Sequence, residues 1–82
     1  MKTEIFSSAI SKRQRLEFLY GLQHVLLEPY YISSNKKGEK VIFGRVNNSS
    51  QIKMFEYNKI FNIKVLSHSK FSPIIPILRY MN

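Results

Sequence analysis

Short runs of alternating apolar and polar residues, separated by turn-forming residues, fill the chain from position 15 to position 66. In the first run Leu16, Phe18 and Tyr20 share one face, because the side chains of a β-strand alternate between its two faces. The runs predict five strands, at residues 15–20, 24–32, 40–46, 52–56 and 60–66. Five short strands with regularly spaced turns favour a barrel over an open sheet, since closure hides the strand edges. We therefore expect a mainly β fold, a small five-stranded β-barrel.

Two of the predicted strands carry a residue that disturbs regular pairing. Pro29 lies in the middle of the second strand, and a proline cannot donate a hydrogen bond to a neighbouring strand. That strand is therefore expected either to be at an edge or to be bulged at Pro29. Gly44 lies inside the third strand, where a glycine marks a bulge, a barrel corner or the close approach of a ligand. Barrel curvature is the explanation that we favour.

The first residues of the chain follow a helical rather than an extended pattern. Within residues 3–12, four apolar side chains recur at helical spacing, namely Ile5, Phe6, Ala9 and Ile10. Thr3 precedes them and is a candidate N-cap, because its hydroxyl can accept a hydrogen bond from a free N–H group of the first turn. The pattern predicts a short N-terminal helix that packs on the sheet.

The last residues of the chain form an apolar tail. Residues 67–82 contain two prolines and a cluster of Ile74, Ile75, Ile77 and Leu78, in a run too short to span a bilayer. The tail is expected either to pack over the barrel or to dock, as an exposed strip, on a partner or a second copy. We expect a single domain over residues 1–82, with its core at about 5–66.

The charge balance is strongly basic. Lys and Arg number 13 and the acidic residues 5, all of them Glu, which gives a formal net charge of +8. Such a balance favours polyanionic partners. The chain has no Cys, no secretory signal pattern and no apolar run long enough for a bilayer, so we expect a cytoplasmic protein without a membrane partner.

Residues for catalysis or for metal binding are scarce. His24 and His68 are the only histidines, and the chain contains neither Cys nor Asp that could orient a histidine or act as a nucleophile. A metal site needs three or four ligands at defined spacing, and the sequence shows no such set. Gly21, Gly38 and Gly44 stand alone rather than in a phosphate-binding loop. We therefore expect no enzymatic activity, no cofactor and no metal.

Cations interleaved with aromatic residues are the pattern that points to a ligand. The cations are Lys12, Arg13 and Arg15 before the first strand, Arg45 in the third, Lys53 in the fourth and Lys59 after it; the aromatic residues among them are Tyr20, Tyr30, Tyr31, Phe43, Phe55 and Tyr57. Cations neutralise phosphates and aromatic faces stack on bases, as in proteins that bind single-stranded nucleic acids. Core packing is the alternative role for each aromatic residue and is favoured for Phe18 and Phe43, whereas Tyr30 and Tyr57 remain open between the two.

The order and spacing of these segments resemble the WYL domain family. The family pattern runs from a helix ending in Ala-Ile through a basic stretch, a strand ending in Tyr, a Pro-centred strand and the strand that names the family to a segment of the form Arg-x-Phe-x-x-x-Arg-Ile. The corresponding segments here are Ala9-Ile10, then residues 12–15, 16–20, 28–32, 40–45 and 53–60. Lys53 and Lys59 stand where the family has arginines, and a lysine keeps the charge but lacks the two-pronged guanidinium.

This resemblance implies a Sm-like or Src homology 3-like barrel that binds nucleotide-like effectors or nucleic-acid fragments within bacterial transcription or phage-defence regulators. By position, the residues facing the ligand would be Tyr20, Lys53, Phe55 and Lys59, with Arg45 beside them and with Arg13 and Arg15 as weaker candidates. We therefore expect a non-catalytic regulatory module that senses a nucleotide-like anion or binds single-stranded RNA or DNA. The alternative is a protein-interaction or dimerisation module that uses the barrel and the tail at residues 72–82.

Overall fold

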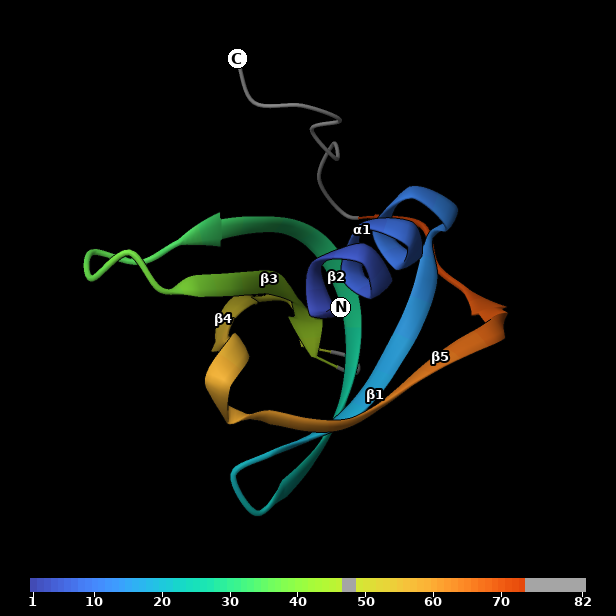
Figure 1. Cartoon of the computed structure of the whole chain (residues 1–82). Coiled ribbons are helices and arrows are strands. Elements are labelled where there is room, and N and C mark those ends of the chain that lie inside the picture. The colour runs from blue at the N-terminus through green and yellow to red at the C-terminus, as the bar shows by residue number, and fades with distance from the viewer. Residues whose placement is uncertain (47–48, 74–82) are drawn as a thin grey trace.

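A computed structural model gives the fold and describes residues 1–46 and 49–73. One helix is followed by five strands and a single 3-10 turn (Figure 1). The elements in chain order are α1 (Lys2–Lys12), β1 (Gln14–Tyr20), β2 (Gln23–Ser34), β3 (Lys40–Val46), β4 (Ile52–Glu56), η1 (Tyr57–Lys59) and β5 (Ile60–Lys70). The mainly β fold with a short N-terminal helix, predicted from the alternation of apolar residues, is thus confirmed.

All five strands pair antiparallel in a single sheet, in the order β4-β3-β2-β1-β5. Figure 1 shows that the sheet is strongly curled, with η1 leading from β4 into β5 and α1 lying across β2 and β1. Over the residues that the structure describes, β4 and β5 are the two ends of the order and no backbone ladder joins them. The hydrogen-bonded sheet is therefore open, where the sequence predicted a closed barrel.

The core lies between the helix and the concave side of the sheet. Its buried members are Phe6 and Ala9 of α1, Leu16 and Phe18 of β1, Val25 and Leu27 of β2, and Ile42, Phe55 and Ile60 of the other strands. The alternation in β1 is therefore as predicted, since Leu16 and Phe18 are both buried while their neighbours are half-buried. Burying one such side chain stabilises the fold by about 1.5–3 kcal/mol, so this cluster is the main source of stability.

The start of α1 differs from the prediction. The helix begins at Lys2 with Met1 as its N-cap, and no side chain caps it. Thr3 lies inside the helix, and its hydroxyl instead forms a hydrogen bond with the Tyr57 hydroxyl at 3.2 Å. The helix ends at Lys12, and the C-cap residue Arg13 adopts the left-handed conformation (φ 57°) common at this position and donates its backbone N–H to the Ile10 carbonyl at 3.1 Å.

The bulge predicted at Pro29 is present, although β2 is a central strand rather than an edge. The register of β2 against β3 shifts between Pro29 and Tyr31, and Gly44 is the residue opposite Pro29. A Cβ atom at position 44 would lie 2.3 Å from the carbonyl oxygen of Glu28 and 2.9 Å from side-chain carbons of Leu27. The glycine is therefore required by the close approach of two backbones at the bulge.

β5 is longer than predicted, and the residue that follows it packs against β2. It continues to Lys70, which pairs with Gln14, although the sequence placed its end at residue 66. Phe71 then donates its backbone N–H to the Arg13 carbonyl at 3.1 Å, and its ring stacks on Tyr30 with the centroids 5.7 Å apart. The start of the predicted tail is thus packed, whereas the apolar cluster of residues 74–78 lies outside the described residues.

Replacing Gly44 by alanine tests this account of the bulge. We expect Gly44→Ala to lower the free energy of unfolding by about 1–3 kcal/mol, because the added methyl group meets a backbone oxygen that cannot move independently of β2. Urea denaturation followed by circular dichroism measures the change. Ser33→Ala, at an exposed position of β2, is the matched control and should change stability by less than about 0.5 kcal/mol. Equal effects of the two substitutions would show that the close approach does not constrain position 44.

Candidate anion-binding surface

The buried carboxylate of Glu28 is held by two arginines. It lies on one face of the sheet, and the side chain of the preceding residue, Leu27, lies on the other face. Glu28 faces Arg45 directly in the β2–β3 register, and the β1–β2 register, in which Leu16 faces Leu27, brings Arg15 to its other side. Arg45 is bidentate: its Nε donates to Glu28 Oε1 at 2.9 Å and its Nη2 donates to Oε2 at 3.1 Å. Arg15 Nη2 donates to the same Oε2 at 3.1 Å. The three side chains form one cross-strand row.

This row is an internal link rather than an open anion site. Glu28 is only 2 % exposed, so its charge is satisfied by the protein and not by water. The hydrogen bonds to Glu28 raise the pKa of Arg45 above its ordinary value, so this guanidinium keeps its charge. Arg15 also donates to the Ser69 hydroxyl at 3.0 Å and to the Lys70 carbonyl at 2.6 Å, which ties the end of β5 to the row.

Three of the aromatic residues predicted to face a ligand are used in packing. Phe55 is 6 % exposed and makes edge-to-face contacts with Phe18 and Tyr20, at centroid distances of 5.6 and 4.9 Å. The Tyr20 hydroxyl accepts a hydrogen bond from the backbone N–H of Glu56 at 3.1 Å. Tyr30 is fully buried against Phe71. Phe55 and Tyr30, which the sequence placed among the candidate ligand residues, are thus both buried and pack against other aromatic rings.

The predicted lysines, by contrast, are exposed. Lys53 lies on β4 opposite Gly44, and Lys59 ends η1. Lys59 makes a loose pair with Glu56 at 3.6 Å, and an exposed pair of this kind contributes little. Arg13 is exposed as well, at the turn between α1 and β1. The structure therefore separates the predicted residues into an internal group around Glu28, a core group around Phe55 and an exposed group of cations.

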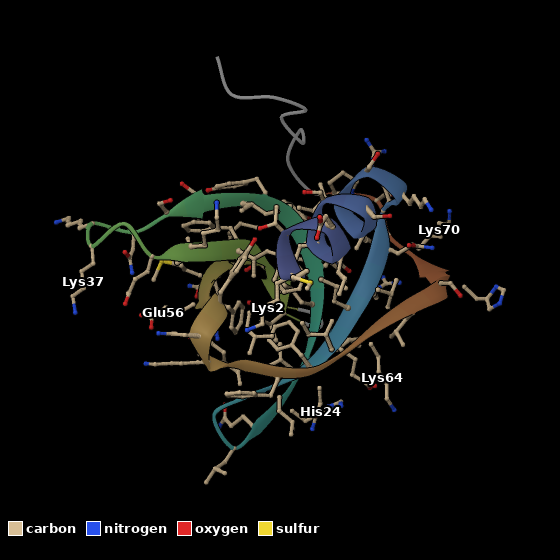
Figure 2. All side chains as sticks on the ribbon, in the orientation of Figure 1. Lys2, His24, Lys37, Glu56, Lys64 and Lys70 are labelled. Carbon is tan, nitrogen blue, oxygen red and sulfur yellow. The ribbon has the colours of Figure 1, made fainter. Side chains whose placement is uncertain are left out.

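Most of the cations within residues 1–46 and 49–73 have no carboxylate partner. Those without an ion pair are Lys2, Lys12, Arg13, Lys36, Lys37, Lys40, Lys53, Lys64 and Lys70. None of the five glutamates pairs with these cations. Glu28 is buried between two arginines, Glu4 pairs with the N-terminus, Glu17 with His24 and Glu56 with Lys59, and Glu39 lies in the β2–β3 hairpin. Figure 2 shows Lys37 on the side of the molecule opposite Lys64 and Lys70, so the positive charge is not confined to one side.

An exposed aromatic residue that the sequence did not single out lies among these cations. Phe61, at the start of β5, is 56 % exposed, and Lys2 Nζ lies 5.9 Å from the centroid of its ring. Lys2 is held there by a hydrogen bond from its Nζ to the Tyr57 carbonyl at 2.6 Å. Burial raises the pKa of the neighbouring Tyr57, and its hydrogen bond with Thr3 opposes that rise. The sequence signal was weak, because Phe61 lies directly beside the core residue Ile60.

Metal sites and membrane-crossing helices are not found in the part of the chain that the structure describes. It contains no group of three or more His, Cys, Asp or Glu side chains that could hold a metal ion. None of its helices is long and apolar enough to cross a membrane. The surface cations without carboxylate partners are one feature from which a function can be argued.

Neutralising Glu28 tests the role of the buried row. We expect Glu28→Gln to lower the free energy of unfolding by about 3 kcal/mol, because two partly exposed arginines then share a neutral partner that is itself buried. Chemical denaturation measures the loss. Glu39→Gln, at an exposed hairpin position, serves as the control and should cost less than about 0.5 kcal/mol. A Glu28→Gln protein as stable as the control would mean that the row does not fasten the strands.

Comparison with known proteins adds no identification to this geometry. No family model, no curated protein and no solved structure matches the chain. What the surface binds is therefore argued from its own residues.

Proposed function

We propose that this protein is a non-catalytic binding module for single-stranded nucleic acid, built on a WYL-like, Sm-like barrel and serving a regulatory role. The observation that carries the proposal is the set of surface cations without carboxylate partners in residues 1–46 and 49–73. The phosphates of a polynucleotide are the partner that such a surface neutralises, with the release of counterions. The curled five-stranded sheet and its order β4-β3-β2-β1-β5 are compatible with the barrel part of the proposal, although no backbone ladder joins β4 to β5 in the described residues.

Lys53 and Lys59, together with the weaker candidate Arg13, are the predicted ligand residues whose side chains are exposed. The two lysines lie one before and one after the turn from β4 into η1. A lysine binds phosphate as a point charge with rotatable donors, without the fixed geometry of a guanidinium. Lys53 and Lys59, which occupy positions where the WYL family has arginines, therefore suit contacts with the phosphate backbone of a nucleic acid of any base sequence.

The alternative function, a protein-interaction or dimerisation module, depends mainly on the apolar tail. Its cluster of residues 74–78 falls outside the described residues, and Phe71, the first apolar residue before it, is packed on Tyr30. The charge of the surface thus favours the nucleic-acid module.

Fluorescence anisotropy with short single-stranded RNA and DNA at low and moderate salt tests the proposal. We expect binding that weakens steeply with salt, and we expect Lys53→Ala/Lys59→Ala to weaken it further. The slope of log K against log salt concentration should fall by about 0.7 for each phosphate that the variant no longer neutralises. The unfolding curve should hardly change, because both side chains are exposed.

The matched control removes two other exposed lysines, in Lys36→Ala/Lys37→Ala at the β2–β3 hairpin (Figure 2). A smaller decrease in affinity for this control would indicate that the strand binds near η1. Absence of binding of any strand to the unmodified protein would overturn the proposed function.

A further inference from the structure

A bulge in β5 makes an irregular place on the surface of the sheet. Glu17 of β1 faces Lys64, and Leu19 faces Phe61, so two residues of β5 lie opposite the single residue between Glu17 and Leu19. One of the two is Asn62, which has a φ of 57°. A positive φ is uncommon outside glycine but is tolerated by asparagine, and bulges of this kind re-aim the neighbouring side chains.

A surface pocket of about 450 Å³ lies at this bulge. Polar side chains of three neighbouring strands line it: Glu17 of β1, His24 of β2, and Asn62 and Lys64 of β5. Figure 2 shows His24 and Lys64 on the same side of the molecule. His24 Nε2 lies 3.1 Å from Glu17 Oε2, whereas Glu17 Oε1 makes no hydrogen bond within the described residues. The pocket thus offers Glu17 Oε1 as a hydrogen-bond acceptor, with His24 and Lys64 as the other ionisable side chains that line it.

Phe61 adjoins this pocket. Leu19, which lines the pocket, is the register partner of both His24 and Phe61, so the three side chains lie in one row on one face of the sheet. Of the aromatic residues that the structure describes, Phe61 alone is exposed, while the others are buried or half-buried. An exposed aromatic ring contributes nothing to the core, but it is the surface on which a base stacks. Lys2 on one side of the ring and Lys64 in the pocket supply charge for the flanking phosphates.

We propose that Phe61 and the pocket at the β5 bulge form the base-binding site of the module, selective for purines that carry an amino group. The base stacks on Phe61, and its amino group donates a hydrogen bond to Glu17 Oε1. Purines stack more strongly than pyrimidines because their rings are larger, and uracil has no amino group to donate. Lys59, two residues before Phe61, connects this site to the phosphate contact near η1. This inference rests on the proposed function and adds its ligand class.

The test measures binding of short oligoriboadenylate and oligoribouridylate strands by anisotropy. The unmodified protein should bind the adenylate strand more tightly than the uridylate strand. Phe61→Ala should lower affinity for the adenylate strand at least about fivefold, whereas Phe61→Tyr, which keeps the aromatic face, should restore it. Leu22→Ala, at a fully exposed apolar residue in the β1–β2 turn, is the control for removal of apolar surface and should leave both affinities unchanged.

The role of Glu17 is read from selectivity rather than from affinity. Glu17→Ala removes the acceptor together with a negative charge, so we expect the uridylate strand to bind at least as tightly as before and the preference for adenylate to fall toward unity. Thermal unfolding of each variant shows that it is folded. A Phe61→Ala protein that binds both strands as the unmodified protein does, or a preference that Glu17→Ala leaves intact, would overturn the base site and leave the proposed function standing. If the unmodified protein binds neither strand, nor any other, the proposed function itself fails.

Discussion

The carboxylate of Glu28 is the group on which the arrangement of the sheet depends. A buried carboxylate without partners is strongly destabilising, so the fold is stable only when Arg15 and Arg45 lie beside it. That requirement fixes β1 and β3 in register on either side of β2, because a slip of one residue would turn an arginine to the other face. Arg15 extends the same restraint to β5 through Ser69 and Lys70. One acidic side chain thus orders four of the five strands.

Because Arg15 and Arg45 are hydrogen-bonded to Glu28, an anionic ligand would have to be bound mainly by other cations. Arg45 is committed to Glu28 by two hydrogen bonds, so in the proposed function the phosphate contact falls to lysines such as Lys53 and Lys59. Lysines attract a polyanion from any direction but do not distinguish one base from another. In the proposed function, selectivity therefore has to come from groups of a different kind, such as the aromatic face of Phe61 and the carboxylate of Glu17, which lie near each other among the described residues.

The sequence was sufficient for the strands and for the special backbone positions, because both depend on local chemistry. Alternation located β1, β3 and β4 to within a residue or two, and the bulge at Pro29 followed from its missing N–H. The partners of side chains were less accessible. The sequence did not distinguish Glu28 from the other four glutamates, because its pairing with Arg45 depends on register across two strands. Alternation does not show which face of β4 meets the core, so Phe55 was expected to face a ligand while it packs on Phe18.

The β5 bulge connects the stability of the fold with its surface. Ile60 is buried, so regular alternation would next direct Asn62 and Lys64 toward the core. The extra residue at Asn62 shifts the phase, and Ile63 packs against the core instead. β5 is an end strand with a single neighbour in the described sheet, so the irregularity disturbs only the ladder with β1. The shift that keeps two polar side chains out of the core is also the one that places them beside Glu17 and next to an exposed Phe61. Removing the bulge would therefore cost the base site and the packing of Ile63 together.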